Sequence, residues 1–433
     1  MLKQPSWFWA IKKSLSSNYT TVVLSCIIFI IIAGSQSAFG VFFKPMSQEF
    51  GWNRASTSGP FSVFLIVNGV LTIIMGRLND RIATWKFVSI GAVLAGLSFV
   101  LMSTIHNIWE LYLYYGVVLG ASWSTMFIPL VSNVTKLFTK RRGLMSGITV
   151  AGIGAGFGII PPIVSQLIAI FNWRLAALYF GIFMMASIII LGQLLRMTPK
   201  PESGKKPLSN NQEQGSHRSF YYSLSEAIRT SQFWFISITY TLFGFYFYVI
   251  LVHIVPYGSD RGLSAVTAAT VLTAIGLGSA VSRIGLGYIS DRISIRKTII
   301  LSCAVSSLSF FLLAFVHAVW VLYVFAIIYG LFSGLATFSI SINAEYFGVK
   351  ELGAISGIGL FGNAVGSAAG PVLAGVIYDR MGNYQIIFLL CAIAGVSSVT
   401  LMWLLKPTRI NYQLANNKLQ QKNSIQVAED SDS

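Results

Sequence analysis

Charged side chains are scarce in this sequence, and their scarcity indicates the class of protein. Asp, Glu, Lys and Arg together make up 10% of the 433 residues, whereas soluble domains carry roughly a quarter. Hydrophobic residues make up 55% of the chain, and the mean hydropathy is +0.70. Most of the chain must therefore face lipid or other apolar helices, which predicts an integral membrane protein.

Cysteines and ligand-binding motifs are scarce as well. Cys26, Cys303 and Cys391 each stand alone in an apolar run, which excludes a disulfide framework and a cysteine metal site. The glycine-rich stretches at 152–158 and 362–370 precede no phosphate-binding lysine, so they predict close helix packing rather than ATP binding. No His/Asp/Ser or zinc-ligand cluster occurs in the apolar runs. We therefore expect neither an enzyme nor a bound metal or cofactor.

Long uncharged apolar runs are what the sequence has in abundance. A bilayer core about 30 Å thick needs about 20 apolar residues per spanning helix, and runs of that length recur along the whole chain. They are too long, and alternate too little, to be membrane strands. We predict an all-α membrane protein with twelve spans, near residues 20–43, 57–78, 87–105, 109–133, 143–170, 175–196, 232–256, 265–290, 298–316, 319–344, 353–378 and 384–405.

Lys and Arg are distributed unevenly between the two sides of these spans. Most of the 30 cations fall on the side of both termini, whereas the other side holds only Lys44, Arg54, Arg174, Arg261 and Arg380. Because cytoplasmic loops collect Lys and Arg, we predict a multi-pass protein of the cell (inner or plasma) membrane with both termini cytoplasmic. The net charge of +16 then reflects topology and attraction to membrane lipid. Scattered basic residues in short loops argue against nucleic-acid binding.

The chain repeats itself at about half its length. Pro45, Gly76, Asp80 and Trp109 recur 211 positions later as Pro256, Gly287, Asp291 and Trp320, and five residues of the fifth span recur 210 positions later in the eleventh. The repeat predicts two six-helix bundles, 1–196 and 231–405, joined by a cytoplasmic linker at 197–230 and followed by a cytoplasmic tail at 406–433. Parallel repeats are typical of alternating-access transporters that hold substrate near the midplane.

A charged loop motif closes the second and eighth spans. It reads Gly76-Arg77-Leu78-Asn79-Asp80-Arg81 in the first copy and Gly287-Tyr288-Ile289-Ser290-Asp291-Arg292 in the second. Here the chain resembles the major facilitator superfamily, whose cytoplasmic loop motif is Gly-x-x-x-Asp-Arg/Lys-x-Gly, although Ala83 and Ser294 replace the second glycine. The resemblance implies the twelve-helix major facilitator fold, with Asp80, Arg81, Asp291 and Arg292 in a cytoplasmic gate. For each of them, a solvated charge that only sets topology is the alternative.

Arg283 is the cation that lies inside a predicted span. It precedes Asp291 by eight positions, so it lies roughly 12 Å inside the membrane from that helix end. All 14 acidic residues fall in loops, tails or span ends, so the sequence offers Arg283 no buried carboxylate. Retained intramembrane charges mark ligand or ion pathways, and guanidinium groups bind carboxylates through two parallel hydrogen bonds. We predict that Arg283 binds an anionic ligand; an ion pair with a span-end acid such as Asp260 is the alternative.

His253 is the only histidine inside a predicted span, three residues before Pro256. It either contacts substrate or takes a proton near neutral pH, or it packs with its hydrogen bonds satisfied. Pro256 and the nearby glycine predict that this helix opens at its outer end. Further polar span residues are candidates for lining a cavity, with helix-to-helix hydrogen bonding as the alternative: Gln36, Trp123, Ser279 and Asn363.

Within the superfamily, the sequence most resembles bacterial monocarboxylate transporters and the neighbouring oxalate/formate antiporters. The segments that carry this resemblance are Gly40 to Pro45, Glu49 to Trp52, Lys140 to Gly147, His253 to Tyr257, Asp260 to Gly262, and Arg283. The resemblance implies that Arg283 binds the substrate carboxylate, that His253 lines the site, and that Asp260 and His253 are candidates for proton coupling. The antiporters have a second cation where this chain has Asn363, and one fixed cation suits a monoanion better than oxalate.

These patterns together predict a secondary transporter of small monocarboxylates such as lactate or pyruvate, coupled to protons, that works by alternating access as a monomer. Electroneutral exchange of organic anions without protons is the alternative, and stimulation by a counter-anion without a pH effect would favour it. A non-transporting membrane sensor is the alternative from another class, and binding without flux would favour that.

Overall fold

The computed structural model describes residues 17–78, 82–138, 142–198, 222–316, 318–348 and 351–406. Within these ranges the chain is all-α, without strands. Several predicted features lie outside them: Asp80 and Arg81 of the first gating motif, most of the linker (199–221) and most of the tail (407–433). The side chain of Asp291 is likewise outside the described part.

Twelve stretches of the described chain are long and apolar enough to cross a membrane. In the N-terminal half they are α2 (Asn18–Phe50), α3 (Arg54–Leu78), α4 (Thr84–Met102), the composite of α5 (Ile108–Leu111), the π-helical η1 (Tyr112–Leu119) and α6 (Gly120–Leu137), α7 (Arg142–Phe171) and α8 (Trp173–Met197). In the C-terminal half they are α10 (Ser231–Asp260), α11 (Ala265–Ile293), α12 (Ile295–Phe315), the composite of α13 (Val319–Phe332), the 3-10 helix η2 (Gly334–Phe338) and α14 (Ser339–Phe347), α15 (Leu352–Met381) and α16 (Gln385–Leu404). The prediction of an all-α, twelve-span fold is confirmed.

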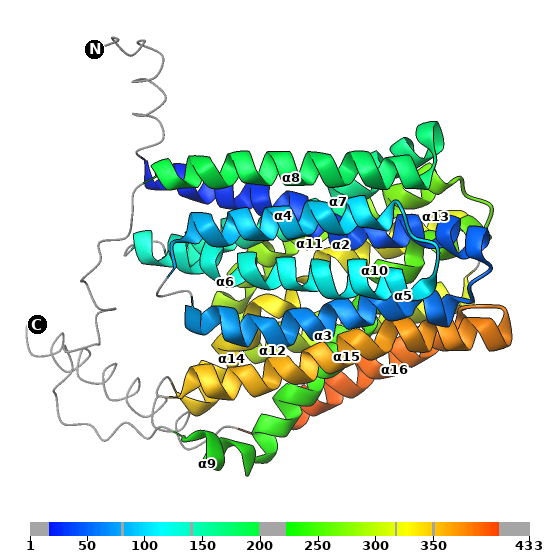
Figure 1. The fold of residues 1–433 in the computed structure, drawn as a ribbon. Coiled ribbons are helices and arrows are strands. Elements are labelled where there is room, and N and C mark those ends of the chain that lie inside the picture. Colours follow the sequence, from blue (N-terminus) through cyan, green and yellow to red (C-terminus); the bar gives the residue numbers. More distant parts are fainter. Residues whose placement is uncertain are drawn as a thin grey trace, which may run out of the picture.

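The helices run side by side and define two ends of the molecule (Figure 1). At one end α8 stops, and the short helix α9 (Leu224–Ile228) leads into α10; we call this the linker end. The connections at 51–53, 261–264 and 382–384 lie at the opposite end, which we call the Asp260 end.

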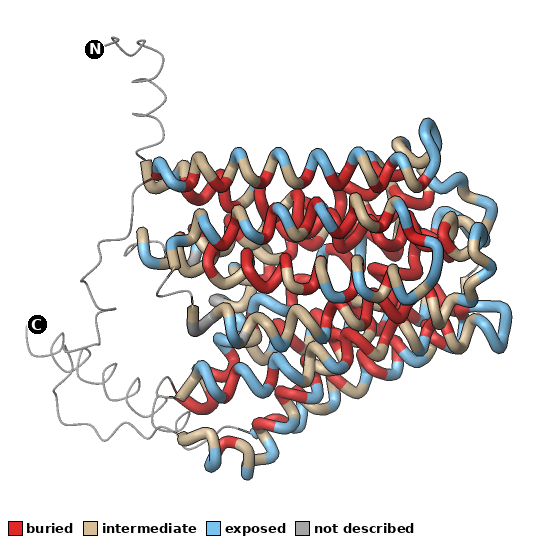
Figure 2. Tube along the Cα trace, viewed as in Figure 1, coloured by how far each residue is buried: buried red, intermediate tan, exposed pale blue. Residues whose placement is uncertain are grey.

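Apolar side chains cover the outside of the bundle as well as its inside. Figure 2 shows buried residues along the inner faces of the helices and exposed residues along the outer faces. Many of the exposed residues are large hydrophobics, among them Leu308, Ile190, Ile66 and Trp403. Apolar surface on this scale is unfavourable in water, so the outer faces are the lipid-facing sides of a multi-pass membrane protein.

Glycines in α7 determine how closely that helix approaches its neighbours. On the side that faces α2, a Cβ built on Gly152 would lie 2.5 Å from the carbonyl oxygen of Cys26. On the side that faces α11, Gly158 packs so closely on Gly276 that a Cβ on Gly276 would clash with the Gly158 amide nitrogen. The predicted packing role of the α7 glycines is confirmed, and Gly158 with Gly276 joins the two halves of the chain.

The two halves touch toward the Asp260 end and separate toward the linker end. A Cβ on Gly375 of α15 would lie 2.6 Å from the amide nitrogen of Ala55 in α3. Gly147 lies about two helical turns before Gly154 on the same face of α7, yet a Cβ built there meets no described atom within 4 Å, and the same holds for Gly287 of α11. The described structure is therefore closed at the Asp260 end and parted at the linker end.

Helix α10 continues through Pro256 to Asp260, so the prediction that it opens there is wrong. Proline removes only the helical hydrogen bond to the residue four positions earlier, which is Val252. The Val252 carbonyl oxygen would lie 3.0 Å from a Cβ built on Gly40 of α2. Because glycine has no Cβ, α2 packs closely enough to cover this carbonyl, and the helix stays intact.

Arg174 ties together three N-terminal elements at the Asp260 end. Its Nη2 lies 2.8 Å from Oε1 of Glu49, at the end of α2. Its Nη1 donates to the backbone carbonyls of Ser103 and Ile105, after α4, at 3.0 Å each. The other Glu49 oxygen accepts from Nε1 of Trp173 at 2.5 Å. This hub fixes the start of α8 against the ends of α2 and α4.

Arg174→Ala is expected to destabilise the protein without touching the interface between the halves. Hydrogen bonds to a charged group contribute about 1.5–3 kcal/mol, so we expect the melting temperature of the purified protein to fall by about 2–5 °C. Arg229→Ala, which removes an exposed arginine at the linker end, is the matched control and should leave the melting temperature unchanged. Equal melting temperatures for the two variants would contradict the prediction.

Candidate functional site

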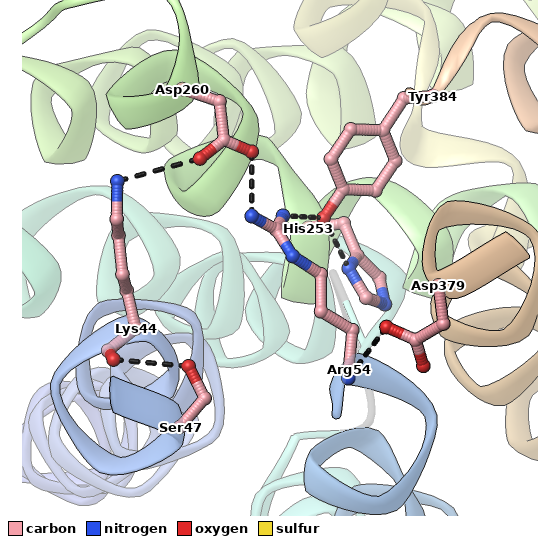
Figure 3. A network of polar contacts seen from close by, with 7 residues as sticks. All are labelled: Lys44, Ser47, Arg54, His253, Asp260, Asp379 and Tyr384. Atoms are coloured by element: carbon pink, nitrogen blue, oxygen red, sulfur yellow. Dashed lines mark hydrogen bonds and ion pairs between the residues drawn. The ribbon is translucent and has the colours of Figure 1, made fainter. Parts of the chain in front are cut away.

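A cluster of charged residues links the two halves at the Asp260 end (Figure 3). The carboxylate of Asp260, at the end of α10, lies 3.4 Å from Nζ of Lys44 in α2 and 2.6 Å from Nη2 of Arg54 in α3. The Arg54 pair is the stronger one, because it is shorter and the Arg54 side chain is 14% exposed against 33% for Lys44; exposed ion pairs contribute little. Asp260 thus pairs with these two cations rather than with Arg283.

Arg54 is also held by α15 and by the residue before α16. Its Nη1 donates to the Tyr384 hydroxyl, and its guanidinium carbon lies 3.6 Å from the centre of the Tyr378 ring. The backbone N–H groups of Arg54 and Ala55 donate to the two carboxylate oxygens of Asp379 at 2.9 and 2.8 Å. Negative charge is favourable at a helix N-terminus, so Asp379 of the C-terminal half caps α3 of the N-terminal half.

His253 is buried in the same cluster, at 1% exposure. Its Nε2 lies 2.9 Å from the carbonyl oxygen of Pro371 and 3.2 Å from Oγ of Ser58, and its Nδ1 lies 3.0 Å from the Tyr384 hydroxyl. A carbonyl oxygen only accepts, so Nε2 carries a hydrogen, and in the neutral imidazole Nδ1 accepts from Tyr384. Burial raises the pKa of the Tyr384 phenol, with the Arg54 guanidinium opposing, so this hydroxyl keeps its proton. We call Lys44, Arg54, His253, Asp260, Asp379 and Tyr384 the Asp260 cluster.

A second polar group lies deeper between the halves. Gln36 of α2 donates from Nε2 to the Tyr248 hydroxyl of α10 at 3.4 Å, and its backbone carbonyl accepts from the Tyr115 hydroxyl at 3.4 Å. Arg283 of α11 interacts electrostatically with Tyr248. Helical side chains lean toward the helix N-terminus, so Arg283 leans away from the linker end and toward Tyr248.

Arg283 has a donor that nothing in the described structure uses. Its Nε is buried and has no hydrogen-bond partner among the described residues. Ser279 lies four positions earlier and so on the same face of α11, and its buried hydroxyl is also without a partner in that part of the chain. Buried unsatisfied groups cost about 1–3 kcal/mol each. This face of α11 therefore favours a ligand with hydrogen-bond acceptors. We call Gln36, Tyr248, Ser279 and Arg283 the central cluster.

Two polar clusters that bridge the halves of a twelve-span bundle are consistent with a membrane carrier, and the sequence comparisons decide the family. The family model of the Major Facilitator Superfamily matches residues 25–335 and again residues 268–426. The two matches together cover most of the chain. The chain belongs to the major facilitator superfamily. It is a transporter of this superfamily, as the loop motif and the internal repeat predicted.

Named relatives of this transporter are monocarboxylate transporters. Monocarboxylate transporter 12 of Mus musculus is 24% identical over 388 residues (84% of this chain, 80% of that protein), and monocarboxylate transporter 11 of Homo sapiens is 26% identical over 372 residues (82% and 76%). A bacterial homolog of the human lysosomal transporter Spinster, inward-facing and occupied, matches with a TM-score of 0.70 at 13% identity (89% of this chain, 96% of that chain). The predicted resemblance to monocarboxylate transporters is confirmed, and the solved structure supports the fold.

The other described site residues that were predicted for the transporter have contacts outside these two clusters. Trp123 of α6 packs against Phe64 of α3, and its buried indole N–H has no partner in the described ranges. Asn363 of α15 donates to the Tyr240 carbonyl of α10 at 2.7 Å, a helix-to-helix hydrogen bond within the C-terminal half. Arg292 at the linker end donates to Tyr288, one turn earlier in α11. Among the described residues, no three His, Cys, Asp or Glu side chains group as metal ligands.

The sequence therefore predicted three members of the central cluster, Gln36, Ser279 and Arg283, and two of the Asp260 cluster, His253 and Asp260. Tyr248, which was not predicted, contacts Gln36 and interacts electrostatically with Arg283, whereas His253 and Asp260 lie together in the Asp260 cluster. Arg54 and Tyr384, which hold that cluster together, were also missed. One signal for Arg54 was available: few cations fall on that side of the membrane, so an acid there has few possible partners.

Asp260→Asn is expected to open the Asp260 end of the transporter, because it removes the charge that both cations share across the halves. Hydrogen bonds to charged groups contribute about 1.5–3 kcal/mol, which corresponds to a shift of about ten- to a hundredfold in the closed population. The measurement is the rate at which a cysteine at position 62 (Ser62→Cys) reacts with a hydrophilic maleimide. The three native cysteines are first replaced, so that position 62 carries the thiol that reacts. Ser62 is 8% exposed and donates to the Ala368 carbonyl across the interface.

Lys44→Ala is the graded control, since it removes only the longer and more exposed of the two Asp260 pairs. It should raise the labelling rate less than Asp260→Asn does. An Asp260→Asn protein that labels as slowly as its parent would show that these ion pairs do not hold the Asp260 end closed.

Proposed function

We propose that this transporter carries small monocarboxylates of the lactate and pyruvate class, coupled to protons, by alternating access. The observation that carries the proposal is the Arg283 guanidinium, whose Nε is buried and unused among the described residues. Asp260, which the sequence offered as an alternative partner of Arg283, forms its ion pairs with Lys44 and Arg54 instead. Burying a charge is costly unless it is paired and hydrogen-bonded, and a substrate carboxylate would supply both. The monocarboxylate transporters among its relatives support the same substrate class.

The central cluster has the chemistry to bind such a substrate. Arg283 would hold the carboxylate, and the free hydroxyl of Ser279 and the amide of Gln36 would meet its remaining polar atoms. Only one cation is present in this cluster, so a monoanion is neutralised whereas a dianion would keep one charge. Trp123 and Asn363 stay proposed lining residues.

The cycle that we propose uses the two halves, residues 1–196 and 231–405, as bundles that rock against each other in a functional monomer surrounded by lipid. The cation-rich linker end would face the cytoplasm, so the described structure would be the inward-open form in the cell membrane. Asp260 is our candidate for the coupled proton, because its charged form binds Lys44 and Arg54 across the closed end. Asp80, Arg81, Asp291 and Arg292 would form the gate at the cytoplasmic end.

Uptake of labelled L-lactate and pyruvate into proteoliposomes tests this function, with and without an inward proton gradient. We expect accumulation that requires the gradient and collapses with a protonophore, against protein-free liposomes as the control. Uptake that depends on internal oxalate or formate, with no effect of pH, would replace symport by anion exchange. Binding without flux would point to a sensor, and neither binding nor flux would end the monocarboxylate assignment.

A further inference from the structure

Four groups of the closed end form a chain of hydrogen bonds with a fixed direction. Arg54 Nη1 donates to the Tyr384 hydroxyl, Tyr384 donates to His253 Nδ1 at 3.0 Å, and His253 Nε2 donates to the Pro371 carbonyl at 2.9 Å. The Pro371 carbonyl only accepts, so Nε2 carries a hydrogen, and in the neutral imidazole Nδ1 is then the acceptor for the Tyr384 hydrogen. With a neutral His253, every donor and acceptor of this chain is therefore paired.

A proton on Nδ1 is incompatible with this direction. A protonated imidazole donates from both nitrogens, so the Nδ1 hydrogen and the Tyr384 hydroxyl hydrogen would point at each other. The hydroxyl must then turn away from the histidine, while its oxygen still accepts from Arg54. Tyr384 is 2% exposed, so water cannot readily replace the lost acceptor. The Nδ1–H group then donates to the Tyr384 oxygen, and the buried Tyr384 hydrogen is left without an acceptor, which is unfavourable in the closed form.

The charges around His253 also disfavour its protonated form while the Asp260 end is closed. The groups against the imidazole are Ser58 of α3, Phe43 of α2, Pro371 of α15 and Tyr384 before α16, with Arg54 of α3 beside them. The other titratable groups of the cluster lie around Arg54, Asp260 and Tyr384: Lys44 from α2, Tyr378 and Asp379 from α15, and Tyr257 and Asp260 from its own helix. Both carboxylates are already engaged: Asp260 with two cations, and Asp379 with the start of α3. In the described part of the chain, neither carboxylate forms a hydrogen bond or an ion pair with the imidazole. A charge on buried His253 would lie beside Arg54 and be disfavoured.

We propose that His253 makes the Asp260 end sensitive to pH. Protonation of its Nδ1 weakens the contacts between the halves, so acid at that end favours the open form. This goes beyond the proposed function and holds for any substrate. The coupled proton must cross the membrane, whereas this proton binds and leaves on one side. It therefore changes how often the carrier opens at the Asp260 end, but not the accumulation that a gradient can drive.

The size of the effect follows from linkage. An imidazole in contact with water takes up its proton near pH 6.5, whereas in the closed form His253 stays neutral. The open form binds the extra proton, so falling pH shifts the equilibrium toward it. Between about pH 7.5 and 5.5, the ratio of open to closed molecules should rise about tenfold.

Distances between spin labels at Ile170 and Met381 test the proposal. These side chains are 68% and 56% exposed, and they lie at the Asp260 ends of α7 and α15, one in each half. The full chain, with its native cysteines replaced by alanine, is measured in nanodiscs without substrate. Acid should increase the share of the longer distance. A pair within the N-terminal half, Ile170 with Leu113, should not change.

Two histidine variants assign the response. His253→Gln is neutral at every pH and offers both an N–H for Pro371 and an oxygen for Tyr384, so it should stay closed in acid. His106→Gln removes an exposed histidine at the same end and should respond like its parent. His253→Asn replaces His253→Gln if the longer amide does not fold.

Two outcomes would overturn the proposal. One is a distance distribution of the parent protein that acid does not change. The other is a response that survives in His253→Gln, since the switch would then belong to another group such as Asp260. Because no substrate is needed for the readout, failure of the lactate and pyruvate assignment leaves this test intact.

Discussion

Arg283→Ala is expected to reduce carrier-mediated anion uptake at least about a hundredfold, because two charge-assisted hydrogen bonds to a carboxylate, at about 1.5–3 kcal/mol each, are lost. The guanidinium is the one cation of the central cluster, so no neighbouring group of that cluster can take its place. The measurement is the initial rate of labelled L-lactate and pyruvate uptake into proteoliposomes at matched protein content.

Two further variants separate charge, geometry and folding. Arg283→Lys keeps the charge but not the planar fork that binds both carboxylate oxygens, so its uptake should lie between those of the parent and Arg283→Ala. Ile284→Ala alters the next residue, which is 56% exposed on the lipid-facing side of α11, and should transport normally. Unchanged uptake in Arg283→Ala would remove this residue from the substrate site.

Gly276→Val is expected to have the second large effect, through the crossing of α7 and α11. A Cβ at Gly276 would clash with the Gly158 amide nitrogen and would lie 2.7 Å from the Gly154 carbonyl oxygen. Both are backbone atoms, so the added side chain can be accommodated only if whole helices move apart. Overpacking of this kind costs about 1–3 kcal/mol. We expect uptake to fall more than tenfold.

The same helix supplies a matched control for this substitution. A Cβ at Gly285 meets no described atom within 4 Å, so Gly285→Val adds the same side chain without a clash and should keep near-normal uptake. Melting curves of both variants show whether a loss of uptake comes from unfolding or from the altered contact. Wild-type uptake by Gly276→Val would show that the close crossing is not required for transport.

The fold could be predicted from composition and run length because lipid imposes one simple rule. Every spanning backbone must satisfy its own hydrogen bonds, and apolar runs of sufficient length can do so only as helices. The positions at which helices end were predicted less accurately. α2 and α10 both continue through a proline, since each proline removes a single helical hydrogen bond and tertiary contacts decide whether the helix goes on.

The candidate site was predictable where a residue is unusual for its surroundings, and not where it is ordinary. A cation in an apolar span is rare, so Arg283 could be selected from sequence alone. Arg54 and Tyr384 lie next to helix ends, where arginine and tyrosine are common, and their role depends on which ends meet in space. His253 was selected as a lone span histidine, but which groups surround its two nitrogens follows only from the packing of α3, α10 and α15.

Helix α3 begins with two backbone N–H groups whose acceptor, among the described residues, belongs to the other half of the molecule. The Asp379 carboxylate accepts hydrogen bonds from the backbone N–H groups of Arg54 and Ala55. The Asn53 side chain, which directly precedes the helix, accepts from the Ser56 N–H. Most helix starts are capped by their own flanking residues. When the halves part, the first turn of α3 loses this cap and its amides pass to water. The capping of this helix is therefore coupled to the motion of the two halves. The rate at which these two amide hydrogens exchange with solvent should follow the rate of opening at the Asp260 end.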